Sequence, residues 1–270
     1  MKVFVEGIGL RAPGIANWPA GKAVLQTLHA RGVPDFQLTA PALLPPAERR
    51  RATDAVKLAI EVCSEACAHA ERDPQTLASV FASSGGDGAT ITAILEVLAG
   101  DAPEISPTRF HNSVHNAPAG YWSIGTQSMA ASTSVCAYDW SCGAGLLEAA
   151  SQAASTGQPV LLALYDLRYP APLPAARPIK DSFGIAFVLT PHETPRSLAA
   201  FALALRPRRG ETITGLPEAS WEALRHSNPA ARALPLLRAL TASRVQTVDL
   251  DYMAHSLLRI TVTPLGTTVR

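Results

Sequence analysis

The sequence is poor in cysteine and aromatic residues and carries almost no net charge. Its 270 residues include 4 Cys and 6% Phe, Trp and Tyr, and 23 Lys+Arg balance 22 Asp+Glu to leave a charge of +1. Near-neutrality argues against a nucleic-acid partner, which proteins attract with a positive field. A hydrophobic content of 47% with only 17% charged residues excludes a disordered tail. We therefore expect a folded chain that binds no nucleic acid.

Segments for membrane insertion, secretion and metal binding are also missing. No apolar run reaches the ~18–20 residues of a membrane-spanning helix. The opening run of residues 1–7 contains Glu6, which is typical of a strand rather than a signal peptide. Cys63 and Cys67 lack a second Cys or His pair at ligand spacing, so we interpret them as small buried hydrophobic residues. These absences predict a reduced, cytoplasmic protein with no metal and no membrane span.

Common cofactor and nucleophile motifs are absent as well. Gly7-Ile8-Gly9 lacks the third glycine of a dinucleotide site, and residues 84–88 lack the Lys-Ser/Thr of a phosphate loop. No Gly-x-Ser-x-Gly motif is present, so a serine hydrolase has no anchor. His111 and His115 have neither a Glu between them nor a third ligand nearby. We predict no cofactor.

What the sequence does contain is many small residues, 47 Ala and 18 Gly, within alternating strand and helix patterns. We predict strands over residues 3–8, 80–83, 132–137, 160–164, 184–189, 199–205 and 257–262. We predict helices over residues 18–28, 48–70, 90–98, 143–154, 217–224 and 231–240. Such alternation is typical of a layered α/β fold. No clear linker divides the chain, so we expect a single domain over residues 1–270.

One strand–turn–helix unit could carry chemistry. The predicted strand 133–137 leads into a turn over residues 138–143 and then into a helix rich in small residues. Such a turn exposes one side chain, and the following helix N-terminus lowers the pKa of a nucleophile placed there. Cys142 lies in this turn, so one hypothesis makes it a thiolate nucleophile. The alternative is a small thiol buried where the helix begins.

The motifs around this unit resemble those of β-ketoacyl synthases. Asn116-Ala-Pro-Ala-Gly120 resembles the Asn-x-x-Ala-Gly segment of that family, and Ser132-Thr-Ser-Val135 resembles the strand before its nucleophile. Residues 143–153 resemble the nucleophile helix, and residues 3–9, 83–88 and 183–189 match flanking segments. The resemblance covers residues 1–190, the N-terminal half of a ketosynthase, and leaves 191–270 as an abbreviated C-terminal part. It implies a thiolase-like layered α-β-α fold, truncated in the second half.

The departures from the family concern the catalytic residues. Counting back from Gly157 places the family's nucleophilic cysteine at Trp140, whereas counting forward from Asn116 places it at Asp139. After Leu189 the chain has no His-Gly-Thr and no Gly-Thr-Asn, where the family carries its histidines and oxyanion loop. Without a base and oxyanion donors, decarboxylative condensation loses its electrostatic support. The corresponding pseudo-active site comprises Asp139, Trp140, Ser141 and Cys142.

A ketosynthase relative without a nucleophile resembles the chain-length factor of aryl polyene and type II polyketide systems. The resemblance implies a non-condensing subunit that pairs with a catalytic ketosynthase, as a heterodimer or a dimer of heterodimers, shapes its acyl tunnel and works with an acyl carrier protein. It places the partner and tunnel interface at Asn116, Gly120, Tyr121, Trp122, Thr133 and Val135. Trp140 is then either a plug of the pseudo-active site or an ordinary buried aromatic residue.

Two other functions stay open at this point. The chain could be a self-sufficient 3-oxoacyl synthase or acyltransferase that uses Cys142, or an inactive homodimer that binds an acyl ligand. The basic runs Arg49-Arg50-Arg51 and Arg206-Pro-Arg208-Arg209 could dock an acidic carrier protein in either acyl-transfer scheme, or could simply be solvated.

Overall fold

A single eight-stranded mixed sheet organises the computed structural model, which describes residues 1–29, 36–101 and 103–266. The strand order is β3-β2-β4-β5-β1-β6-β8-β7, parallel between β2 and its two neighbours and antiparallel elsewhere. The strands are β1 Lys2–Arg11, β2 Ala78–Ala82, β3 Ser132–Val135, β4 Val160–Asp166, β5 Phe183–Thr190, β6 Ala199–Pro207, β7 Gln246–Tyr252 and β8 Ser256–Pro264. The α-helices are α1 Trp18–Thr27, α2 Pro46–Arg51, α3 Asp54–His69, α4 Gly88–Leu98, α5 Pro107–Asn112, α6 Ala117–Thr126, α7 Ser141–Thr156, α8 Ala219–Ser227 and α9 Leu234–Leu240.

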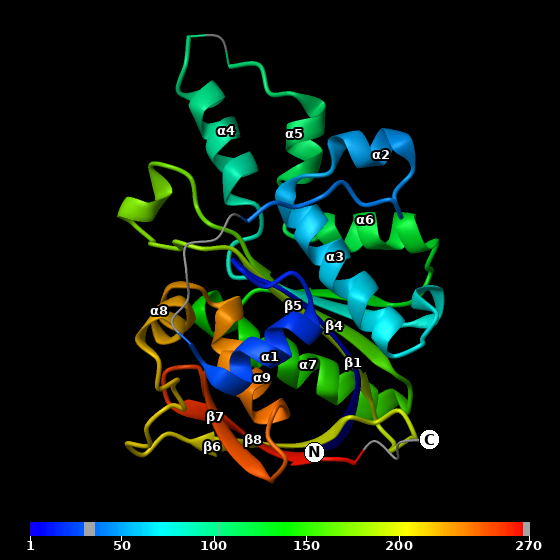
Figure 1. Ribbon diagram of the computed structural model, residues 1–270. Coiled ribbons are helices and arrows are strands. Elements are labelled where there is room, and N and C mark those ends of the chain that lie inside the picture. The colour runs from blue at the N-terminus through cyan, green and yellow to red at the C-terminus, as the bar shows by residue number, and fades with distance from the viewer. Residues whose placement is uncertain (30–35, 102, 267–270) are drawn as a thin grey trace.

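Helices cover both faces of the sheet (Figure 1). Helices α3 and α6 pack on one face, and α1, α7 and α9 pack on the other. Strands β6, β8 and β7 then curl beneath α7, so that this helix contacts β2 and β7 although they lie near opposite ends of the strand order. The thiolase-like layered α/β expectation is therefore confirmed, and α7 is enclosed by the sheet itself.

The apolar run of β4 shows why the sheet needs two helical layers. Leu162 and Leu164 belong to the core on the α7 side, whereas Leu161 and Ala163 belong to the core on the α3 side. Because successive side chains of a strand point to opposite faces, a strand covered on both faces is apolar throughout. The same reason explains β5, in which every residue is buried.

Two glycines allow the helices to approach the sheet closely. A Cβ at Gly145 of α7 would lie 2.6 Å from the Cβ of Ala82 in β2. A Cβ at Gly9 of β1 would lie 2.0 Å from the carbonyl oxygen of Val62 in α3. Since Cβ atoms do not approach other atoms so closely, a larger residue at either position would push a helix off the sheet.

Several predicted boundaries were wrong. The helix expected over residues 48–70 is two helices, α2 and α3, because Ala52 and Thr53 adopt extended backbone between them. The turn expected over 138–143 is shorter, since α7 already begins at Ser141 and includes Cys142. Residues 231–240 form a 3₁₀ turn, η4 (Ala230–Ala233), followed by α9. Helices α5 and α6 and strand β7 were not predicted. In the described part of the chain, no helix is long and apolar enough to cross a bilayer.

Candidate functional site

The turn between β3 and α7 has the backbone of a strained elbow. Tyr138 adopts a left-handed conformation with φ of 53°, which is uncommon for an aromatic residue. Ser141 closes the turn, because its hydroxyl accepts a hydrogen bond from the amide of Ala137 at 3.0 Å and donates one to the carbonyl of Tyr138 at 2.7 Å. The family pattern places its nucleophile at Asp139 or Trp140. The strained residue, Tyr138, therefore lies immediately before the first of these two positions.

A carboxylate held by two arginines occupies the position next to the elbow residue. Arg177 donates to Asp139 at 2.8 Å, and Arg232 lies 3.3 Å from the other carboxylate oxygen. Arg232 also pairs with Asp251 at 3.4 Å, and Asp251 pairs with Arg208 at 3.0 Å. The charges alternate in sign along this row, so each is compensated by its neighbours. Paired with two guanidinium groups, Asp139 is a weak nucleophile.

The elbow side chain itself is a tyrosine covered by a cation. Tyr138 is 57% exposed, and the guanidinium carbon of Arg177 lies 3.6 Å from the centre of its ring. An open cavity of about 410 Å³ lies beside the pair, lined by Tyr138, Asp139, Ala176, Arg177, Pro178, Ile179, Lys180, Ala223, His226, Ser227 and Pro229. Trp140 is half-buried, so it is neither a fully buried core residue nor a freely exposed one. Sequence analysis missed Tyr138, Arg177 and Arg232, which lie far apart in the chain.

Two cysteines lie near the elbow: Cys136 is exposed and lies 3.4 Å from the carbonyl of Ser84, whereas Cys142 is enclosed in the core. Cys142 is 2% exposed and belongs to the core on the α7 side. Burial raises the pKa of its thiol to about 12, although the positive charge of Arg232 acts in the opposite direction. A neutral, inaccessible thiol cannot act as an acyl acceptor. The geometry thus favours the alternative of a small buried thiol over the nucleophile hypothesis.

A buried carboxylate that sequence analysis missed lies at the end of β4. One oxygen of Asp166 accepts hydrogen bonds from the Ser83 hydroxyl at 3.0 Å and from the Ser84 amide and hydroxyl at 2.8 and 2.7 Å. Its other oxygen accepts from the amide of Ala230 at 3.1 Å. Burial raises the pKa of Asp166 to about 6, and the hydrogen bonds from Ser84 limit the rise. This carboxylate ties the ends of β2 and β4 to η4, which supplies Arg232.

Strand β3 forms an open edge of the sheet. Its inner side pairs with β2, since Ser79 and Ser83 donate to the carbonyls of Ala131 and Val135. Because the direction of backbone groups alternates along a strand, Ser132 and Ser134 point their peptide groups away from β2. The predicted interface residues Thr133 and Val135 have half-buried side chains on this edge strand.

The other predicted interface residues divide between surface and core. Asn116 and Gly120 are exposed, and a Cβ at Gly120 would meet open space. Tyr121 and Trp122 are buried inside this chain, against α3, so their side chains do not form a surface. A role of Tyr121 and Trp122 at the partner or tunnel interface stays a prediction. Close to the β3 edge in sequence, Met129 is 97% exposed.

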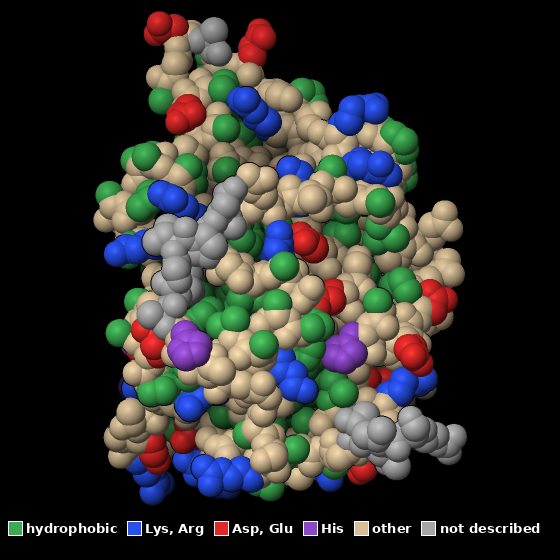
Figure 2. All heavy atoms as spheres, in the orientation of Figure 1, with side chains coloured by type: hydrophobic (Ala, Val, Ile, Leu, Met, Phe, Trp, Pro, Cys, Tyr) green, Lys and Arg blue, Asp and Glu red, His purple; other side chains and the backbone are tan. Residues whose placement is uncertain are grey.

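The basic residues of α2 have different surroundings. Figure 2 shows basic side chains gathered over this helix. Arg49 donates to the carbonyls of Ala42 and Leu44, both at 2.8 Å, and so serves the chain's own loop. Arg50 and Arg51 are exposed, and Arg51 lies 3.6 Å from Glu48. Of the three α2 arginines, Arg50 and Arg51 are therefore the more accessible to a carrier protein, and the docking role of this run stays a prediction.

No cluster of three or more metal-ligating side chains occurs among the residues that the structure describes. His111 and His115 do not share a helix face, because α5 ends at Asn112. His115 instead lies 3.0 Å from the carbonyl of Ser83.

Comparison with known families identifies the family of this chain. The model of the β-ketoacyl synthase N-terminal domain matches residues 22–249. The chain belongs to this family. No curated protein matches it.

Solved ketosynthase complexes share the fold. A chain in the complex of a ketosynthase with its chain length factor from Xenorhabdus doucetiae has 22% identity and a TM-score of 0.73, over 97% of this chain and 99% of that chain. The ishigamide ketosynthase/chain length factor has 13% identity and a TM-score of 0.74, over 98% and 100%. A type II acyl-carrier protein complex with its hexaketide-bound ketosynthase has 12% identity and a TM-score of 0.74, over 98% and 99%.

Proposed function

We propose that this β-ketoacyl synthase family member is a non-condensing subunit of the chain-length-factor type. In this role it pairs with a catalytic ketosynthase and shapes the acyl tunnel of that partner in aryl polyene or type II polyketide biosynthesis. The observation that carries the proposal is the elbow. At the two positions where the family pattern places its nucleophilic cysteine, this chain has Asp139 and Trp140, and Asp139 is ion-paired to two arginines.

The edge of β3 supports pairing with another subunit. Ser132 and Ser134 present unpaired peptide groups there, and an unpaired edge is a template for a strand of another chain. Exposed apolar side chains nearby in sequence, Met129 and Ile124, would lose contact with water in such a complex. The relatives with the same fold include complexes of a ketosynthase with a chain length factor, which is the kind of partner that we propose.

The pairing is tested by co-expression of the tagged chain with a full-length candidate ketosynthase from the same genome. We expect both proteins to elute together from affinity and size-exclusion columns. Ser134→Pro removes an outward amide of β3 without touching the bonds to β2, and we expect it to abolish co-elution. Ser134→Ala is the matched control, since it keeps the amide, and it should retain the partner. Retention of the partner by a folded Ser134→Pro variant would contradict the β3 interface.

The non-condensing role is tested separately with malonyl carrier protein and an acyl primer. We expect condensation by the complex, no condensation by this chain alone, and no acyl adduct on Cys142 by mass spectrometry. Cys142→Ala in the complex should leave condensation unchanged, because the thiol is buried and neutral. Condensation by the isolated chain, or its loss on Cys142→Ala, would refute the proposal.

A further inference from the structure

We propose that the cavity between α1, α9 and β7 binds a small oxyanion, namely a phosphate ester, a pyrophosphate or a compact dicarboxylate. The cavity holds about 380 Å³, enough for a small metabolite and too small for a macromolecule. It is lined by Leu25, Gln26, Thr214, Gly215, Pro235, Arg238, Ala239, Thr241, Ala242, Arg244, Gln246, Thr247 and Val248. Nothing in the proposed pairing with a ketosynthase uses it.

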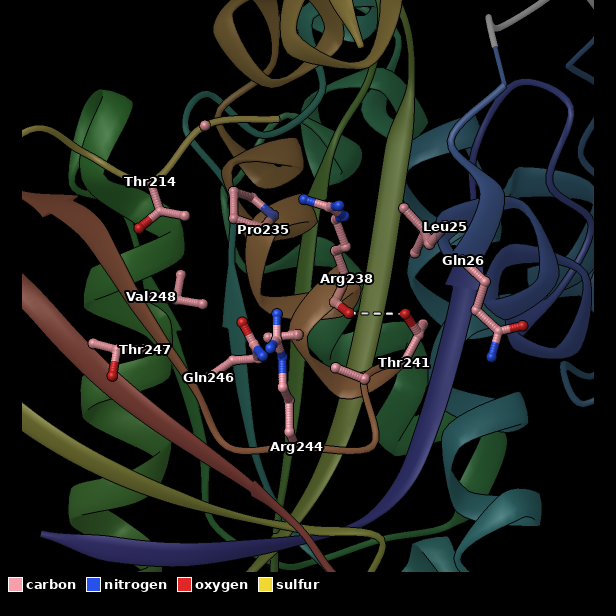
Figure 3. Close-up of a pocket in the computed structure, with 13 residues that line it drawn as sticks. Leu25, Gln26, Thr214, Pro235, Arg238, Thr241, Arg244, Gln246, Thr247 and Val248 are labelled. Atoms are coloured by element: carbon pink, nitrogen blue, oxygen red, sulfur yellow. Dashed lines mark hydrogen bonds between the residues drawn. The ribbon is translucent and has the colours of Figure 1, made fainter. Parts of the chain in front are cut away.

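The charge of the lining comes from two arginines. None of the described residues that line the cavity is acidic. Within the part of the chain that the structure describes, neither Arg238 nor Arg244 has a side-chain hydrogen bond or an ion pair. Figure 3 shows Arg244 and Gln246 extending together into the space between α9 and β7, with Arg238 rising from α9. Two guanidinium groups at a concave surface offer paired donors that match the oxygens of phosphate and carboxylate.

Helix stabilisation accounts for one arginine and leaves the other unexplained. Arg238 lies in the last turn of α9, where a cation interacts favourably with the helix dipole. Arg244 lies beyond the helix, in the loop before β7, so the dipole gives no reason for its position. An oxyanion bound in the cavity would give Arg244 a counter-charge.

The edge of β7 adds a backbone donor. The amide of Asp249 bonds to the Thr214 hydroxyl at 2.9 Å, and its carbonyl accepts from the Thr214 amide at 3.0 Å. Thr247 precedes Asp249 by two residues, so its peptide groups point the same way, toward the cavity wall formed by Thr214. Thr247 lies on the same lining, whereas the hydroxyl of Thr241 donates to the carbonyl of Arg238 at 2.8 Å. Buried apolar residues, Leu25 among them, form the floor.

The inference is tested by calorimetric titration of the full chain with inorganic pyrophosphate and, separately, with succinate, at constant ionic strength. We expect one site with a Kd below about 1 mM for at least one of the two. The tighter of the two probes identifies the source of the oxyanion as phosphate or dicarboxylate.

Two double variants decide whether the cavity is responsible. Arg238→Gln with Arg244→Gln should weaken binding by roughly tenfold or more, because both charged donors are lost. Lys2→Gln with Arg196→Gln removes the same charge from exposed positions outside the cavity and should leave the Kd unchanged. Equal weakening in both double variants, or no saturation by about 10 mM of either probe, would overturn the proposal. Melting curves of both variants check that the fold is kept.

Discussion

The elbow and the α1–α9–β7 cavity are both rich in arginine, but only the arginines of the elbow have carboxylate partners. At the elbow, Arg177 and Arg232 are neutralised by Asp139, a residue of the same chain. At the cavity, Arg238 and Arg244 have no counter-charge among the lining residues. Arginines that are paired internally hold structure in place, whereas arginines without a partner can receive a ligand. The difference explains why we assign the elbow an architectural role and the cavity a binding role.

The two regions also differ in their buried polar groups. Beneath the elbow, the buried carboxylate of Asp166 gathers donors from Ser83, Ser84 and Ala230. The cavity lining contains no comparable buried charge, and its polar groups lie at the surface. The elbow region should therefore respond strongly to loss of a single carboxylate, and the cavity region weakly to loss of a single hydroxyl.

The largest expected effect comes from Asp166→Ala. The change leaves the donors of Ser83, Ser84 and Ala230 without an acceptor in a dry interior, so we expect a loss of about 2–3 kcal/mol in the free energy of unfolding. Urea denaturation at pH 7 measures it. Thr241→Ala in the cavity is the control and should change stability by no more than about 0.5 kcal/mol. Equal losses would show that the two regions do not differ in this way.

The sequence predicts the strands and helices where the hydrophobic pattern is strong. Residues 160–164 and 184–189 lie in β4 and β5, because continuous apolar runs bounded by turn residues have few other solutions. Strand β7 was missed although Val248 and Leu250 are buried between polar neighbours. The alternation of apolar and polar residues in β7 is the pattern that could have predicted this strand. Helix α6 was missed because Pro and Gly weaken its helical pattern.

The candidate site is harder to predict, because tertiary structure assembles it. Counting along the family pattern led to Asp139 and Trp140, but no local pattern indicates that Arg177 and Arg232 would meet there. Cys142 illustrates the opposite problem, since a small residue at the second position of a helix can be buried or exposed. Asp166 did leave a signal: an acidic residue that ends an otherwise apolar buried strand needs partners.

The pH dependence of stability isolates the charge of Asp166. Its pKa is about 6 in the folded chain and 3.8 ordinarily, so the folded state binds the proton more tightly between these values. The stabilisation is present below pH 3.8 and is lost as the pH rises through about 6. Relative to Asp166→Asn, we expect the wild-type free energy of unfolding to fall by about 2 kcal/mol from pH 4.5 to 7. A constant difference between the two proteins would show that the carboxylate does not titrate in this range.

The smallest expected effect on stability comes from a variant that makes the elbow resemble the cavity. Asp139→Asn removes the carboxylate partner of Arg177 and one of the two carboxylate partners of Arg232 and, because Asp139 is partly exposed, should cost only about 0.5–1 kcal/mol. Arg177 then lines the cavity beside Tyr138 without a carboxylate partner, much as Arg238 and Arg244 line theirs, while Arg232 keeps its ion pair with Asp251. If unpaired arginines at a concave surface are sufficient for binding, calorimetry should find a second pyrophosphate site in this variant. Glu193→Gln, an exposed acid outside both regions, should keep the wild-type stoichiometry. A variant that gains no second site would show that the β7 edge, which the elbow cavity does not include, is required as well as the charge.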